Sequence, residues 1–273
     1  MSEDEILEDE TAKPTETASL IRLAPDDLLV TVADPALTED LAMALLKRAD
    51  LPLEVLEQLA KNTNVLKSRK VKIALAGHPH TPRHVSVPLA RQFYTFDLMK
   101  VALSPNVPAD VKVAVDDVLI SRLKAVTVGE RLTLARRASG RVAAALLLEA
   151  EPVEEKIVGT IVESKKRDAK AAGREIRILQ SALDNPRLTE ALVISSVLRP
   201  AASAALVHEV ARHAKWSRRK EIRAALLRTE HLSLARALEF SREVPAAGLQ
   251  EVLASSLLPD KIKSQLLRER GDV

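Results

Sequence analysis

The amino-acid sequence predicts an all-α protein, an α-α superhelix in which short helices stack into a solenoid. The chain of 273 residues is 47% hydrophobic but only 2% aromatic, so its core must be aliphatic. Leu and Ala, which favour helices, dominate the hydrophobic residues, and glycine occurs only 7 times. Helical spacing of apolar residues alternates with proline-bearing turns, and long stretches of the chain repeat.

An ungapped internal repeat relates residues 35–118 to residues 186–269 at an offset of 151 residues. Internal repeats are the signature of stacked architectures. We therefore predict two duplicated halves. The repeat aligns Pro35-Ala36-Leu37-Thr38-Glu39 with Pro186-Arg187-Leu188-Thr189-Glu190, and it pairs Arg48 with Arg199, Ala74-Leu75 with Ala225-Leu226, His80 with His231 and Pro108 with Pro259.

A finer period of about 26 to 30 residues is marked by prolines within the first half. The stretch His78–Pro82 recurs as Ser104–Pro108, and Pro52 precedes Pro82 by a similar interval. Proline cannot continue a helix but fits the first turn of the next one. Each proline is therefore expected at a corner between two short helices that only a neighbouring pair can cover.

Charge divides the chain into an acidic tail and a basic body. Residues 2–19 hold seven acidic residues and Lys13, which gives this tail a net charge of −6. Because the whole chain has a net charge of +3, the remaining residues carry +9. We expect residues 1–19 to be disordered and residues 20–273 to form one continuous solenoid, with helical residues 119–185 joining the halves. An alternative is that the tail folds over the basic body as an autoinhibitory arm.

The stretches Val71–Pro82 and Glu221–Leu227 resemble repeat units of the bacterial leucine-rich repeat variant and HEAT-like families. The resemblance covers both halves and implies short helices stacked into a superhelix, but no activity. The prototype of the variant family carries an iron–sulfur cluster. This chain has no cysteine to hold such a cluster, which also excludes disulfides, thiolate catalysis and zinc sites of the cysteine type.

Several polar and aromatic clusters have a functional and a structural interpretation. His78, His80 and His84 are spaced like metal ligands, but the intervening prolines favour a role at repeat corners. Trp216 could stack on a nucleic-acid base, although a single Trp in a solenoid is more often a packing residue. The Phe93-Tyr94-x-Phe96 cluster is interpreted as a wedge in the core.

Basic residues form the strongest electrostatic signal. On an unbroken helix Arg212, Lys215, Arg219 and Arg223 would align, whereas a turn near Trp216-Ser217 would gather them at a helix start. Such sets could meet phosphates, or simply solvate an outer face. The candidate residues for nucleic-acid or other anionic partners are Arg212, Lys215, Trp216, Arg218, Arg219, Lys220, Arg223, Lys166, Lys170 and Arg174. Lys61, Lys67, Arg69, Lys70 and Lys72 hold comparable places in the other half.

These observations favour a non-catalytic scaffold or adaptor whose solenoid surface binds a protein partner. The alternative is a nucleic-acid-binding HEAT-like protein that uses a basic stripe, and a HEAT-like DNA glycosylase is a distant third. No catalytic residue, metal site or cofactor is predicted. No long apolar run and no leader is found, so we expect no membrane span and a cytoplasmic location. The oligomeric state is left open.

Overall fold

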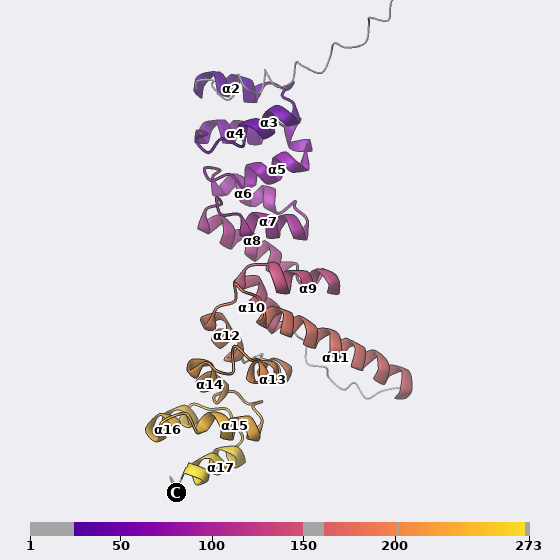
Figure 1. Ribbon diagram of the computed structural model, residues 1–273. Helices are drawn as coiled ribbons and strands as arrows, with labels where there is room; N and C mark the ends of the chain where they lie inside the picture. Colours follow the sequence, from indigo (N-terminus) through magenta and orange to yellow (C-terminus); the bar gives the residue numbers. More distant parts are fainter. Residues whose placement is uncertain (1–24, 150–160, 201, 271–273) are drawn as a thin grey trace, which may run out of the picture. The chain divides into compact units, whose positions relative to one another are not determined.

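The computed structural model describes residues 25–149, 161–200 and 202–270, and these residues are organised entirely as helices and their connections (Figure 1). Within those ranges there are sixteen α-helices, one short 3-10 helix and no β-strand. The prediction of an all-α protein is therefore confirmed. The predicted tail, residues 1–19, lies outside the described residues.

The helices group into two compact units, residues 1–119 and 120–273. The prediction of one continuous solenoid over residues 20–273 stays a prediction. The first unit contains α2 (Pro25–Ala33), α3 (Glu39–Leu45), α4 (Leu53–Lys61), the 3-10 helix η1 (Val65–Lys67), α5 (Arg69–Ala76), α6 (Arg83–Ala90), α7 (Thr95–Leu103) and most of α8 (Ala109–Ser121).

The second unit continues the series of short helices, apart from one long helix, α11. Its helices are α9 (Val128–Arg137), α10 (Gly140–Leu148), α11 (Ile161–Leu183), α12 (Glu190–Val197), α13 (Ala204–Arg212), α14 (Lys220–Leu226), α15 (Leu234–Ser241), α16 (Ala246–Ala254) and α17 (Asp260–Arg270).

Helix starts follow the proline and hydroxyl signals in the sequence. Pro52 and Pro82 are the N-cap residues of α4 and α6, and Pro108 directly precedes α8. The Thr38 hydroxyl accepts a hydrogen bond from the third amide of α3, which removes one of the unpaired donors at that end. Thr189 does the same for α12. The predicted corners are thus confirmed.

The predicted helical stretch over 129–151 contains a break. Helix α9 ends at Arg137, and α10 begins at Gly140. The Ser139 hydroxyl caps the amide of Val142, which competes with continuation of α9. A Cβ atom on Gly140 would clash with the carbonyl oxygen of Arg187, so the backbone of 187 packs directly against the break.

Each unit packs its helices in the same manner. Helix α2 contacts α4, α3 contacts α5, and α5 contacts α7, so a helix packs against the one two places further along. In the second unit α9 contacts α11, α11 contacts α13, α10 contacts α12, and α12 contacts α14. The buried faces are mainly aliphatic, with Val71, Leu75 and Ile222 fully covered.

Helix bounds in the two units recur at the offset of the sequence repeat. Both ends of α4, α6 and α7 recur in this way in α13, α15 and α16. The starts of α3, α5 and α8 recur likewise in α12, α14 and α17. The two units therefore share one spacing of helices and turns over most of their length.

Polar side chains bind neighbouring turns at the repeat corners. Asn62 accepts a hydrogen bond from the amide of Asn64, and it donates to the carbonyls of Val32, in the last turn of α2, and Asp34, in the turn that follows. His78 likewise accepts from the amide of His80 and donates to the carbonyl of Arg48, at the same separation along the chain. Because buried carbonyls need a donor, these side chains hold successive corners together.

The histidine cluster takes the corner role rather than a ligand role. Both ring nitrogens of the buried His78 are engaged, and Nδ1 of His80 lies 3.2 Å from the carbonyl oxygen of Leu51. The exposed His84 lies apart from this role, with Nε2 3.2 Å from Glu57. No lone pair of His78 is therefore left for a metal ion.

Candidate functional surfaces

The basic residues between 212 and 223 surround a turn and not a continuous helix. Helix α13 ends at Arg212, and α14 begins at Lys220. The second of the two arrangements considered for the sequence is therefore correct. Arg212, Arg218 and Lys220 have exposed side chains, so they are available to an anionic partner.

Trp216 belongs to the core, which corrects its place among the binding candidates. The side chain is 2% exposed, and its indole Nε1 donates a hydrogen bond to the carbonyl of Leu183 at 2.9 Å. The Lys215 ammonium lies 3.9 Å from the ring centroid. Since the ring faces are covered by protein, Trp216 cannot stack on a base, and the packing interpretation is confirmed.

Two further members of the basic set are committed to ion pairs within the second unit. Arg219 lies 3.7 Å from Glu190 at the start of α12. The half-buried Arg223 pairs with Glu243, and its guanidinium carbon is 5.4 Å from the Phe240 ring centroid. Arg223 therefore serves the fold, because using it for a partner would break these contacts.

The third basic set lies on α11. Arg174 and Arg177 are exposed on this helix. The structure describes the backbone of α11 at Lys166 and Lys170 but not their side chains, so their part in any site stays a prediction.

The positive charge of the chain is concentrated in one unit. Residues 20–119 contain 12 basic and 12 acidic residues and are formally neutral. Residues 120–273 contain 28 basic and 19 acidic residues, a formal charge of +9. The excess of positive charge therefore belongs to the second unit.

The first unit presents an exposed aromatic site that was expected to lie in the core. Phe93 is 4% exposed, as expected for a wedge, but Tyr94 is 68% and Phe96 38% exposed. Tyr94 is the N-cap residue of α7, where the chain leaves the core, and this position turns its ring outward. The wedge interpretation is correct for Phe93 alone.

Arg69 covers the Tyr94 ring and is held there by a buried carboxylate. The Arg69 guanidinium carbon lies 4.8 Å from the ring centroid. Its Nε and Nη2 donate to Oδ2 of Asp97 at 2.8 and 2.6 Å, and Asp97 is 1% exposed. Because a buried carboxylate keeps its position, it fixes the guanidinium and through it the ring. We call Arg69, Tyr94 and Asp97 the arginine–tyrosine platform.

The sequence contained little to identify this platform. Arg69 was grouped with the basic residues around 61–72, and Tyr94 with the aromatic cluster. The two are far apart along the chain, and only the packing of α5 against α7 brings them together. The one signal in the sequence is Asp97, an acidic residue between the apolar residues Phe96 and Leu98.

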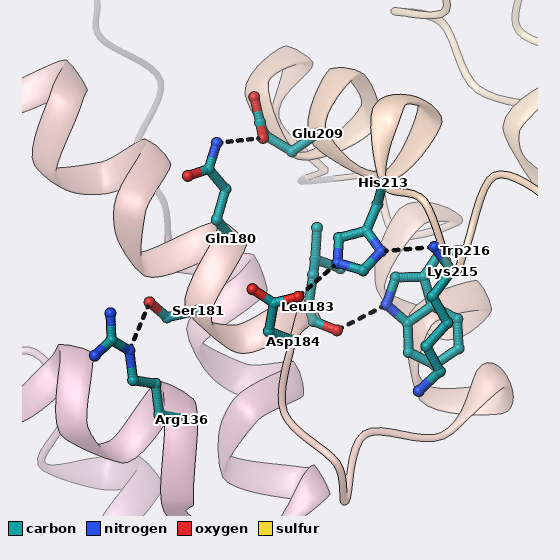
Figure 2. A network of polar contacts seen from close by, with 9 residues as sticks. All are labelled: Arg136, Gln180, Ser181, Leu183, Asp184, Glu209, His213, Lys215 and Trp216. Atoms are coloured by element: carbon teal, nitrogen blue, oxygen red, sulfur yellow. Dashed lines mark hydrogen bonds and ion pairs between the residues drawn. The ribbon is translucent and has the colours of Figure 1, made fainter.

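A shallow pocket with a polar lining lies in the second unit, where α9 packs against α11. Its volume is about 470 Å³. Figure 2 shows part of it together with the contacts of α11 to α13: Arg136 points toward Ser181, Gln180 toward Glu209, and His213 toward Asp184. The lining residues are Leu132, Arg136, Arg177, Gln180, Ser181 and Asp184.

Metal-ligand groups and membrane spans are not found in the described part of the chain. No three His, Asp or Glu side chains there are placed to share a metal ion. Among the same residues, every helix is too short or too polar to cross a bilayer.

Comparisons with known proteins do not assign a family. No family model, no curated protein and no solved structure matches the chain. The resemblance to HEAT-like and leucine-rich repeat variant units therefore stays a prediction.

Proposed function

We propose that the chain is a cytoplasmic, non-catalytic scaffold that binds a protein partner, and that it is a HEAT-like solenoid made of two duplicated halves. The single observation that carries the binding proposal is the arginine–tyrosine platform, in which an exposed aromatic ring lies against an arginine that a buried carboxylate holds in place. The helix spacing shared by the two units supports the duplication.

Matched side-chain contacts support the duplication further. Glu39 and its counterpart Glu190 each pair with a basic residue, Lys70 at 3.3 Å and Arg219 at 3.7 Å, although these two basic partners are not aligned by the repeat. Lys72 contacts Gln92, and Arg223 contacts Glu243 at the equivalent positions of the second unit. Contacts at equivalent places are expected if both halves descend from one ancestral unit.

The platform has the chemistry of a protein-binding hot spot. Tyr and Arg are enriched at such sites because they offer large contact areas and several donors. Arg69 remains 59% exposed although Asp97 engages two of its nitrogens. Since the ring and the guanidinium are already ordered, a partner loses little side-chain entropy on binding.

The platform also indicates the kind of partner side chains it would contact. The open edge of the Arg69 guanidinium suits a carboxylate, and the exposed ring of Tyr94 suits an apolar side chain. We infer a partner segment that combines an acidic and an aliphatic or aromatic residue.

Site-specific photo-crosslinking tests this proposal. A benzoylphenylalanine in place of Tyr94 should form a covalent adduct with one defined protein in cells that express the chain. The matched control carries the same group at Val113, which is also exposed in the first unit but lies on α8. The partner identified at position 94 is then purified, and its dissociation constant is measured.

Truncation of the platform should weaken that complex. Tyr94→Ala is expected to raise the dissociation constant by roughly 30-fold, in the range of hot-spot residues. Asp97→Asn, which releases Arg69 but keeps the shape, should give a smaller loss. Identical adducts at positions 94 and 113, or a Tyr94→Ala variant with unchanged affinity, would remove the basis of the proposal.

Nucleic-acid binding by the second unit is a second candidate, favoured by the charge of +9 on residues 120–273. Affinity for duplex DNA or RNA should fall steeply as salt rises, because bound counterions are released from the phosphates. Replacement of Arg212 and Arg218 by Gln should reduce the slope of that dependence by about 2.

The first unit provides a matched control for this test. Lys61 and Lys67 occupy the positions that the repeat aligns with Arg212 and Arg218. Lys61→Gln/Lys67→Gln removes the same charge from the first unit and should leave the slope of the salt dependence unchanged. Absence of binding at low salt, or equal effects of both double variants, would dismiss the nucleic-acid candidate.

A further inference from the structure

The pocket between α9 and α11 combines two cationic side chains with hydrogen-bonding groups. Arg136 reaches it from the last turn of α9, and Arg177 from α11. Both side chains are exposed, so their guanidinium groups are not consumed by the core. Ser181, one helical turn after Arg177, is buried at the floor, and Leu132 provides an apolar wall.

A hydrogen bond orients Arg136 toward the pocket. Its Nε lies 3.4 Å from the Ser181 hydroxyl oxygen, which leaves the two terminal nitrogens of the guanidinium for another acceptor. Figure 2 shows this side chain extending from α9 to α11. Two guanidinium groups on adjacent helices thus share one concave surface.

The side of the pocket that faces α13 has the opposite charge. Asp184 accepts a hydrogen bond from Nε2 of His213 at 3.1 Å, and Nδ1 of that ring accepts from the amide of Lys215, which assigns the proton to Nε2. Glu209 accepts from the Gln180 side chain at 3.0 Å. These two carboxylates repel an anion that extends beyond the arginines toward α13.

We propose that this pocket binds a phosphate monoester, with Arg136 and Arg177 as the anion-binding groups. A monoester carries close to two negative charges at neutral pH, which two guanidinium groups balance, and Arg donates to phosphate in a bidentate manner. The volume accommodates the phosphate and the group that bears it.

The acidic rim argues for a monoester over a nucleic-acid strand. A phosphodiester chain must continue past the site on both sides, and toward α13 its next phosphate would approach Asp184 and Glu209. A terminal phosphate ends at the arginines, so it meets this repulsion from Asp184 at one phosphate and not again at a second one. The ligand is therefore a small phosphate ester or a phosphorylated side chain, both of which present the same chemistry.

The experiment is a calorimetric titration of the full chain with O-phosphoserine, with a neutral peptide that contains phosphoserine, and with the unphosphorylated peptide. The variant Arg136→Gln/Arg177→Gln should bind the two phosphorylated probes at least about tenfold more weakly than the wild type, because two charge-assisted contacts are lost. The unphosphorylated peptide should not bind.

A control double variant separates the pocket from general electrostatics. Arg137→Gln/Arg199→Gln removes the same charge from the second unit at exposed positions outside the pocket lining. It should change the affinity less than about twofold. The fluorescence of Trp216, the single tryptophan, shows whether each variant retains a folded second unit.

Asp184→Asn supplies a prediction of the opposite sign. Asn keeps an acceptor for His213 but removes a negative charge from the rim, so phosphoserine should bind about two- to fivefold more tightly. A role of the arginines in folding alone would not produce this gain.

The outcomes decide both the site and the source of the phosphate. Equal affinity for O-phosphoserine and the phosphopeptide assigns a small ester, and much tighter binding of the peptide assigns a phosphorylated protein. No binding of either phosphorylated probe, or equal losses in the two double variants, would overturn the proposal.

Discussion

The two units differ far more in their surfaces than in their spacing of helices. The ends of α4, α6 and α7 recur in α13, α15 and α16 without change, yet residues 20–119 of the first unit are formally neutral and residues 120–273 carry +9. The first presents a fixed tyrosine and arginine, and the second presents a polar pocket. Backbone spacing and corner hydrogen bonds thus constrain the skeleton, whereas exposed side chains are free to acquire different chemistry.

The corner after α4 and α13 illustrates this division. Asn62 and His213 occupy equivalent positions, and each accepts a hydrogen bond from the amide two positions later. Their other ends differ: Asn62 donates to the carbonyl of Val32, whereas His213 donates to the side chain of Asp184. The hydrogen bond within the turn is kept, although the side chain that accepts it and the acceptor on the neighbouring segment both differ.

The second unit also contains α9 and α10, which precede the repeated stretch. We expect the largest loss of stability when the contact between α10 and residue 187 is disturbed. Gly140→Ala places a Cβ atom against the carbonyl of Arg187. Because the neighbouring backbone has to shift, we expect a loss of about 3 kcal/mol in the free energy of unfolding. Urea denaturation followed by Trp216 fluorescence measures it.

Gly129→Ala serves as the control for that prediction. No atom lies within 4 Å of the Cβ that this change adds, so stability should be unchanged or rise slightly. Equal behaviour of the two variants would show that α10 does not pack against residue 187 as described.

Asp34 and Asn185, which the repeat aligns, should differ in how much each contributes to the free energy of unfolding. The buried Asn185 donates to the carbonyls of Ala135 and Ala138. Asn185→Ala leaves these buried acceptors unpaired and should cost about 2 to 3 kcal/mol. The exposed Asp34 side chain bonds the amide of Ala36, so Asp34→Ala should have only a slight effect on stability. A reversed order would contradict the different roles of the two units' corners.

The pH dependence of stability should originate partly in the first unit. Burial lowers the pKa of His78, an effect that its hydrogen bond to the Arg48 carbonyl and the carboxylate of Asp50 oppose and that His80 reinforces. Below about pH 6.5 the unfolded chain protonates this histidine while the native state does not, so stability falls as the pH falls. The equivalent residue in the second unit, Thr229, does not titrate.

His78→Asn tests the origin of this pH dependence. Asn62 shows that an asparagine can accept from the amide two positions later and donate to the earlier carbonyl. The variant should therefore fold with a loss of about 1 kcal/mol at neutral pH. Denaturation at neutral and mildly acidic pH should show a weaker acid dependence than in the wild type.

The surface ion pairs of the aligned residues Glu39 and Glu190 should give the smallest effects on stability. Glu39→Gln and Glu190→Gln each remove the acidic partner of a pair that is largely exposed, so each should lower stability barely measurably. Similar small losses in both units, measured by thermal denaturation in low salt, would fit the shared skeleton. A loss in only one unit would indicate that the pairs are not equivalent.

The sequence predicted the helices well because their signals are local. Pro52 and Pro82 act through their own backbone, and Thr38 caps an amide three positions away, so none of them depends on distant packing. The break at Gly140 was missed because it depends on residue 187, far along the chain. The exposure of Tyr94 and the pocket at Arg136 were missed for the same reason, since each requires knowing which helices meet.

The affinity of the partner crosslinked at position 94 for the full chain, measured at high salt, tests the central claim most directly. We predict that Tyr94→Ala abolishes most of this affinity, because the proposed binding surface for the protein lies on the first unit. Arg136→Gln/Arg177→Gln, in the second unit, should leave the affinity unchanged. An affinity that disappears at high salt, or that depends on the arginines of the second unit and not on Tyr94, would contradict it.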